Sequence, residues 1–282
     1  MPTYPTPHPV DLAVDVQVGA LEVIASDRVD TVVTIAPTNP HKDADRRGAD
    51  GTVVELDGRR LTVVTPKPRF TLVGPGESVD IRVELPTGSR LTAEVSAGGV
   101  RSSGRLGATR VKTSSGRATL GTTGDLWLRA GHGAAVVEAA EGTVEITADH
   151  GQIRVGRITG DAVLKASHGN VSVTESGGEV EARLSYGDLE ITRALGSVTA
   201  KTAYGSILLH EVSSGSIEAD SGYGEIVVAV RDGVPAWLDL ASKNGRVRNG
   251  LDADRAPTGA EQAVAVRART QFGDIDVRRA SS

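Results

Sequence analysis

Residues 143–160 read TVEITADHGQIRVGRITG, and this stretch decides the fold because close variants of it recur along the chain. Apolar and polar residues alternate in each half, which is the period of a β-strand with one buried face. Each half ends at a glycine, and glycine readily adopts the positive φ that a tight corner requires. The stretch therefore predicts two short strands and two corners.

The glycine that ends the first half recurs at intervals of 17 to 19 residues. This first series comprises Gly98, Gly116, Gly133, Gly151, Gly169, Gly187, Gly205 and Gly224. A second series, half a period later, comprises Gly107, Gly124, Gly142, Gly160, Gly178, Gly196, Gly215 and Gly233. A fixed period near twenty residues is typical of a solenoid, whose units bury their apolar faces only by stacking.

The sequence thus predicts an all-β fold, a parallel β-solenoid (β-helix) with rungs of about 18 residues that each contain two short strands. A right-handed coil is expected, as for other parallel crossovers. A three-sided coil would also fit this period, but it would need an aliphatic residue at every sixth position. The inward columns of the two-sided model begin with Leu126, Val144, Ala162, Val180, Val198 and Ile217, and with Leu128, Ile146, Leu164, Ala182, Ala200 and Ala219.

We expect a single β-solenoid domain over residues 1–282 with an end cap on each side. Residues 1–95 would form irregular N-terminal rungs and a cap, 96–233 the regular repeats, and 234–282 the C-terminal rungs and cap. Residues 37–51 are expected to form a surface loop or one short helical turn, and 66–76 and 249–259 irregular loops. Residues 264–277 repeat the corner once more and close the chain. Covered ends matter because open sheet edges pair with other chains.

Composition excludes several classes of function. Cysteine is absent, so disulfide and thiolate chemistry are not expected. The net charge of −5 offers no electrostatic basis for nucleic-acid binding. No apolar stretch approaches the roughly 18 residues of a membrane span, and residues 1–9 do not resemble a signal peptide, so a cytoplasmic location is expected. Standard catalytic, phosphate-binding and metal-binding motifs are missing, and we expect no cofactor or metal.

The corners also carry a family resemblance. The motif Tyr-Gly-x-Ile/Leu recurs at residues 186–189, 204–207 and 223–226, alongside the strands at 77–89 and 266–277. These features resemble the bacterial putative-adhesin family of β-strand repeats, domain of unknown function 4097, of the actinobacterial type. The resemblance extends over nearly the whole chain. It implies a repetitive β fold and no particular activity.

The residue before each glycine of the first series defines a ring column. Its members are His132, His150, His168, Tyr186, Tyr204 and Tyr223, and Ser115, Asn244 and Phe272 hold the same place in other repeats. Stacked rungs would place them about 5 Å apart along one corner. They could form a structural ladder, a binding stripe, or a set of acid–base or metal-binding groups. Because their register continues the inward parity, the structural ladder is favoured.

A second candidate surface is the basic column on an outward face, which comprises Lys112, Arg129, Lys165, Arg183 and Lys201, with Thr147 in the same series. Stacked like charges repel each other. The column therefore indicates either an acidic partner or a solvated surface whose charge is offset by residues such as Glu145, Glu181 and Glu218.

These patterns predict a non-enzymatic binding or scaffold module with an unknown protein or small-molecule partner. We expect no nucleic-acid partner and no insertion into a membrane. Two alternatives stay open. One is an unorthodox enzyme of the lyase or cyclase type that uses the His/Tyr edge of the solenoid. The other is a self-assembling structural protein, for which a homo-oligomer is expected.

Overall fold

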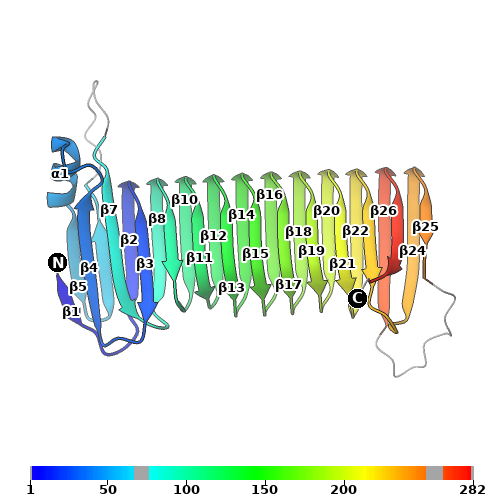
Figure 1. The fold of residues 1–282 in the computed structure, drawn as a ribbon, viewed down its shortest axis with the longest axis horizontal. Coiled ribbons are helices and arrows are strands. Elements are labelled where there is room, and N and C mark those ends of the chain that lie inside the picture. The colour runs from blue at the N-terminus through cyan, green and yellow to red at the C-terminus, as the bar shows by residue number, and fades with distance from the viewer. Residues whose placement is uncertain (1, 67–75, 252–262, 281–282) are drawn as a thin grey trace. The chain divides into compact units, whose positions relative to one another are not determined.

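The computed structural model describes residues 2–66, 76–251 and 263–280. The chain divides into two compact units, residues 1–138 and 139–282. Each unit is a stack of short strands in two facing sheets, and Figure 1 labels the strands. The prediction of one domain with three segments stays a prediction, whereas the all-β, two-sheet solenoid is confirmed.

Unit 1 holds one helix and the first strands of the chain (Figure 1). Its helix is α1 (Asp43–Asp50), and its strands are β1 (Thr3–Pro5), β2 (Asp11–Val18), β3 (Leu21–Ser26), β4 (Asp30–Pro37), β5 (Val53–Asp57), β6 (Arg60–Val64), β7 (Val79–Pro86), β8 (Arg90–Ala97), β9 (Val100–Ser103), β10 (Thr109–Ser115), β11 (Ala118–Thr123) and β12 (Leu126–His132). Strand β13 (Ala135–Ala140) spans the boundary between the units.

The regular secondary structure of unit 2 consists of strands alone among the residues that the structure describes. They are β14 (Val144–His150), β15 (Ile153–Ile158), β16 (Ala162–His168), β17 (Val171–Ser176), β18 (Val180–Tyr186), β19 (Leu189–Ala194), β20 (Val198–Tyr204), β21 (Ile207–Val212), β22 (Gly215–Tyr223), β23 (Ile226–Val230), β24 (Ala236–Asn244), β25 (Val247–Asn249), β26 (Val264–Phe272) and β27 (Ile275–Arg279).

In unit 1 the strand order is β1-β4-β7-β3-β9-β11 in one sheet and β5-β6-β2-β8-β10-β12 in the other. Neighbours pair in parallel, except that β1 with β4, β4 with β7, and β5 with β6 are antiparallel. The first rung of the chain, β2 and β3, therefore lies between strands that follow it in sequence. The strands β1 and β5 form the edges of the two sheets in this unit.

In unit 2 the order is β15-β17-β19-β21-β23-β27-β25 in one sheet and β14-β16-β18-β20-β22-β26-β24 in the other. The pairs are parallel, and corresponding residues of the regular rungs lie 18 positions apart, as Ile146 and Leu164 do. The strands that close the chain, β26 and β27, are not the last of the stack. They lie between β22 and β24, and between β23 and β25.

The core lies between the two sheets of each unit and follows the predicted columns. Every member of the two inward columns given above is buried, and Ile146, Leu164 and Ala182 have no exposed surface. The facing sheet contributes Ile153, Val171, Leu189, Ile207 and Ile226, also fully buried. Such small and aliphatic side chains match the short distance between two packed sheets. The two-sided coil is therefore confirmed over the three-sided one.

Glycine is required in the two series for different structural reasons. All eight glycines of the first series have positive φ, from 137° to 158°, as predicted. In the second series only Gly215 and Gly233 do, so the same prediction is wrong for the others. Their requirement is space: a Cβ on Gly160 would lie 2.6 Å from the carbonyl oxygen of Gly142 in the neighbouring rung. Glycine is needed there because successive corners touch.

Residues 37–51 contain α1, which is longer than the predicted single turn. Its Asp45 is buried and accepts hydrogen bonds from the amides of Asn39 and Ser78, at 3.1 Å each. The helix contacts β4 and β7 and so belongs to the cap of unit 1. The loops predicted at 66–76 and 249–259 fall mostly outside the described residues. Among those described, no helix has the length and apolar character of a membrane span.

Candidate functional site

The ring column is assembled in unit 2 as predicted. Strand pairing aligns its six members there, which are His150, His168, Tyr186, Tyr204, Tyr223 and Phe272. Neighbouring ring centroids are 4.8 to 5.0 Å apart, and the ring planes deviate from parallel by 2° to 8°. The spacing equals one rung of a parallel sheet, so the backbone alone sets it. His132 aligns with Ser115 in unit 1.

The geometry of the corner explains why these rings stack. Each ring residue ends its strand and precedes a glycine with positive φ. The carbonyl oxygen of the ring residue then accepts a hydrogen bond from the corner glycine of the preceding rung, as Tyr204 does from Gly187 at 2.9 Å. With the backbone repeated in this way, successive side chains leave the corner in the same direction.

The rings lie at the surface rather than in the core. The exposed fractions of Tyr186, Tyr204, Tyr223 and Phe272 are between 44% and 50%. The inward parity of the column is therefore misleading, because the chain turns at the glycine and takes the last side chain of the strand out of the space between the sheets. The column is therefore a ladder of rings that are about half exposed.

Stacking limits what the ladder can bind. Within unit 2 both faces of the rings from His168 to Tyr223 are covered by neighbouring rings. A sugar or a flat aromatic ligand would need a free ring face. What remains accessible is the row of ring edges, which carries imidazole nitrogens and tyrosine hydroxyls that donate and accept hydrogen bonds. The ladder therefore suits a polar ligand that contacts several rungs in succession.

The basic column faces solvent, and its charges are largely paired within the protein. Lys165 lies 3.7 Å from Glu145 and Arg183 lies 2.6 Å from Glu181, as the sequence led us to expect. Lys201 is paired at 3.5 Å with Asp220 rather than with Glu218. In unit 1, Lys112 aligns with Arg129 and is paired at 2.5 Å with Glu94. Exposed pairs of this kind contribute at most about 1 kcal/mol each.

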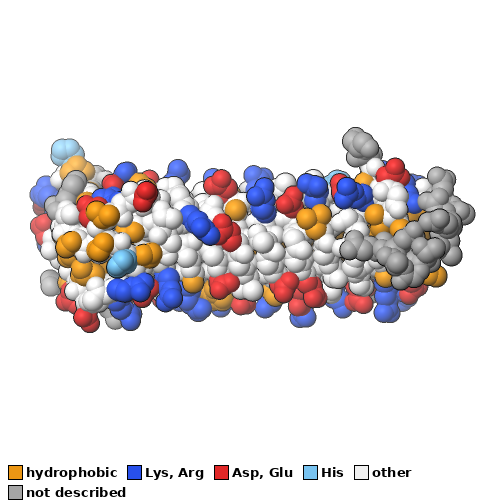
Figure 2. All heavy atoms as spheres, turned by 90° about the horizontal axis from the view of Figure 1, so that it is seen from below, with side chains coloured by type: hydrophobic (Ala, Val, Ile, Leu, Met, Phe, Trp, Pro, Cys, Tyr) orange, Lys and Arg blue, Asp and Glu red, His pale blue; other side chains and the backbone are white. Residues whose placement is uncertain are grey.

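Charged side chains of both signs also alternate on the face of the molecule that Figure 2 displays. Basic and acidic groups are interspersed in rows on both sides of a pale band of backbone and uncharged side chains. Neither sign forms a broad patch on this face.

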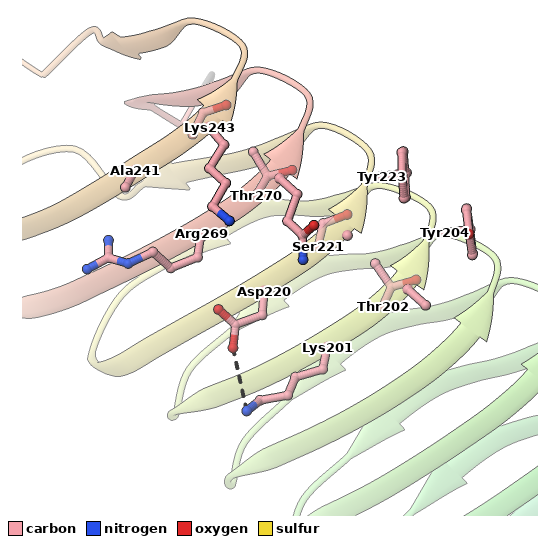
Figure 3. A pocket seen from close by; sticks show the side chains of 14 residues that line it. Lys201, Thr202, Tyr204, Asp220, Ser221, Tyr223, Ala241, Lys243, Arg269 and Thr270 are labelled. Atoms are coloured by element: carbon pink, nitrogen blue, oxygen red, sulfur yellow. Dashed lines mark ion pairs between the residues drawn. The ribbon is translucent and has the colours of Figure 1, made fainter.

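A groove of about 700 Å³ joins the two predicted columns in unit 2. It lies on the outer face of β20, β22, β26 and β24, and its lining includes Lys201, Tyr204, Asp220, Tyr223, Lys243 and Arg269 (Figure 3). The outward residues Ala203, Gly222 and Ala241 are small and leave room above the sheet. The two tyrosines stand at the corner beside the groove, and the Lys201–Asp220 pair lies on its other side (Figure 3).

The groove carries three basic side chains and one acidic side chain. Arg269 is held by Asp239, whose Oδ2 lies 2.5 Å from its Nη2. The hydrogen bond from Arg269 lowers the pKa of the Asp239 carboxyl, with further Coulomb attraction from Arg269 and Arg267. Lys243 forms no ion pair with any residue that the structure describes. The groove is thus locally cationic on a chain whose net charge is −5.

The predicted site residues therefore fall into two groups. Lys112, Arg129 and His132 belong to unit 1, and the other predicted residues lie together in unit 2. Sequence analysis missed Asp220 and Arg269, which extend the basic column where the repeat becomes irregular, and Lys243, which lies between the two columns on β24. Extending the register from Tyr223 to Phe272 and Asn244 would have aligned Asp220 with Arg269, since these are paired positions.

Known proteins that are similar to this chain include one family and several solved structures. The family model described as Toastrack DUF4097 matches residues 11–278, which confirms the resemblance inferred from the corners. The structure of a putative adhesin from Bacteroides fragilis NCTC 9343 is 11% identical, with a TM-score of 0.43 and coverage of 98% of this chain and 95% of that chain. A putative cell adhesion protein from Clostridium sporogenes ATCC 15579 is 12% identical, with a TM-score of 0.20 and coverage of 98% and 94%. The chain matches no curated protein sequence.

Proposed function

The chain belongs to the Toastrack DUF4097 family, and we propose that it is a non-enzymatic binding module whose unit 2 groove holds an acidic, extended segment of a partner protein. The observation that carries the proposal is the groove itself. It places three cationic side chains beside a row of exposed tyrosine hydroxyls on four adjacent strands.

Binding fits the repeated geometry better than catalysis does. The rings of the ladder occupy one backbone position in successive rungs and have one spacing. Acid–base or nucleophilic catalysis requires groups in different roles, oriented toward a common point. A row of equivalent donors instead provides the same contact several times, and this favours an elongated ligand over a small reacting one.

Charge indicates the chemistry of that ligand. Lys201 and Arg269 are each oriented by a carboxylate, which lowers the entropy that they lose when a ligand binds. Lys243 brings a cation with no described partner. Tyrosine hydroxyls and Gln271 add hydrogen-bond donors. Carboxylates accept charge-assisted hydrogen bonds from such a set of donors.

The test measures binding of a fluorescent poly-glutamate peptide by anisotropy, with poly-glutamine as the neutral comparison. We expect the intact chain to prefer poly-glutamate and to lose that preference as salt rises, because exposed charges are screened. Lys201→Gln should weaken binding severalfold. Lys165→Gln is the matched control, since Lys165 lies in the same column but outside the groove. Equal binding of both peptides, or equal loss in both variants, would contradict the proposal.

A double variant tests the tyrosines. Tyr204→Phe combined with Tyr223→Phe removes two hydroxyls and keeps the stacked rings, since Phe272 already stacks in the column. We expect an unchanged melting temperature and weaker peptide binding. If binding is also unchanged, the ladder is structural and the tyrosines have no part in the site.

A further inference from the structure

Strand β24 is an unusual sheet edge. It pairs on one side with β26, and on its other side no described strand pairs with it. It has nine residues, whereas the edge strands of unit 1, β1 and β5, have three and five. Natural proteins commonly protect sheet edges by keeping them short or by adding proline. A nine-residue edge without proline offers a full row of backbone donors and acceptors for pairing.

The side chains of β24 are also incompletely buried. Its inward residues Leu238 and Leu240 are half-buried, although their partners on β26, Val266 and Ala268, have at most 2% exposure. Trp237 on the outer face is 64% exposed. In the facing sheet, Val247 of β25 is 45% exposed, and its partner Ile275 is fully buried. The last rung thus presents apolar surface that the next rung covers everywhere else in the unit.

We propose that this end of unit 2 is a dimer interface, in which β24 pairs antiparallel with β24 of a second copy about a twofold axis. A twofold axis perpendicular to the two sheets reverses the strand direction and brings β24 against its own counterpart. The same rotation places β25 against its counterpart. A second copy fits because each rung is built to pack on another rung of the same dimensions.

Charge complementarity indicates the register. When the twofold axis passes through Ala241, residues whose numbers sum to 482 lie opposite each other. Asp239 of one copy then faces Lys243 of the other, and the symmetry creates this pair twice. A lysine on an edge strand normally opposes association, but here it faces the carboxylate of Asp239, which Arg269 of the same copy also contacts. Trp237 lies opposite Gly245, a position with no side chain to obstruct the indole ring.

The same pairing would extend the groove. Ala241 and Lys243 line it on β24, so two paired β24 strands place two grooves on one continuous sheet face. An extended ligand could then contact both copies. The dimer does not depend on this ligand, and its test does not use one.

The decisive experiment uses cysteine, which the natural sequence lacks. Directly opposed residues of an antiparallel pair have Cα atoms about 4.5–5.5 Å apart, within the range of a disulfide. We therefore expect Ala241→Cys to form a covalent dimer rapidly under mild oxidation. Ala203→Cys is the matched control, because Ala203 is an exposed alanine on the same face, in an inner strand. It should crosslink slowly, through random collisions.

Two further measurements complete the test. The unmodified chain should sediment as a dimer at micromolar concentration, and Lys243→Asp should raise the dissociation constant about tenfold or more by placing like charges opposite each other. Lys165→Asp, an equal charge change away from the edge, should have no effect. A monomer at high micromolar concentration, or equal crosslinking of the two cysteine variants, would overturn the proposal.

Discussion

Units 1 and 2 finish their strand stacks in different ways. In unit 1 the strands turn antiparallel, the edges β1 and β5 are short, and α1 packs against β4 and β7. In unit 2 every described pair remains parallel up to β24, which is long and carries an exposed tryptophan. Short edge strands and a packed helix close the first end, whereas the second end presents a long strand that can still pair. The dimer proposed above uses this second end.

The two units also share one device. The first rung of the chain, β2 and β3, and the last, β26 and β27, are each paired on both sides. These four strands are therefore internal in their sheets, although β1, which precedes them, lies at an edge. Opening any of the four would require the loss of two interfaces at once.

The largest expected effect is a difference in stability between two variants, one substituted in β26 and the other in β24. Val266→Asp places a carboxylate between fully packed strands and should cost several kcal/mol of unfolding free energy. Leu238→Asp changes the facing residue on the half-buried edge and should cost about 1 kcal/mol. Urea denaturation of both variants measures the difference. Equal losses would mean that the edge is as well covered as the interior.

Hydrogen exchange sharpens the comparison without mutation. The amides of β26 should exchange among the slowest in unit 2, although β26 is near the C-terminus, because both of its neighbours must open first. In a monomeric sample the amides of β24 that point away from β26 should exchange quickly. They should slow in the dimer. Fast exchange throughout β26 would contradict its place inside the sheet.

A substitution in the cap of unit 1 should cost less unfolding free energy than Val266→Asp does. Asp45→Ala removes the acceptor of two backbone amides, those of Asn39 and Ser78, and should cost about 1–3 kcal/mol. Asp45→Asn keeps one acceptor oxygen and should lose less than the alanine variant. Thermal melts of both variants test this order. If the alanine variant melts like the unmodified chain, the buried carboxylate does not hold the cap together.

The smallest expected effect is a change of thermal stability at acidic pH. Hydrogen bonds from Arg28 lower the pKa values of Asp30 and Glu84 below their ordinary values of 3.8 and 4.5, and Arg82 adds to the effect at Glu84. A carboxyl whose pKa is lowered in the folded state stabilises the protein at pH values above its ordinary pKa. This stabilisation is lost as the pH falls through the lowered pKa. Melting temperatures of the natural chain and Arg28→Ala should therefore differ slightly at pH 7 and converge as the pH falls through the lowered pKa values of Asp30 and Glu84. A difference that grows in acid would reverse the assigned sign.

Much of the site could be predicted from the sequence because a parallel stack converts sequence spacing into distance. Once Tyr186, Tyr204 and Tyr223 are known to occupy one position in successive rungs, their spacing near 5 Å follows. Their exposure does not follow. Alternate residues of a strand occupy the same face of the sheet. This rule fails at the last residue of each strand, because the chain turns at Gly187 and its equivalents and directs that side chain out of the space between the sheets. The groove was also missed, since part of its lining comes from β24 and β26, which lie outside the regular period.

The sequence alone determined the rung: its alternation, its corner glycines and the columns of aliphatic residues are local properties repeated about every 18 residues. Only the tertiary structure decided the order of the rungs at the two ends. The strand at Val264–Phe272 has an inward face that packs equally well against β22 or at the end of the stack, because neighbouring rungs are nearly equivalent partners. Its place between β22 and β24 is set by pairing in the assembled sheet, since its own pattern of residues does not distinguish an internal position from an edge.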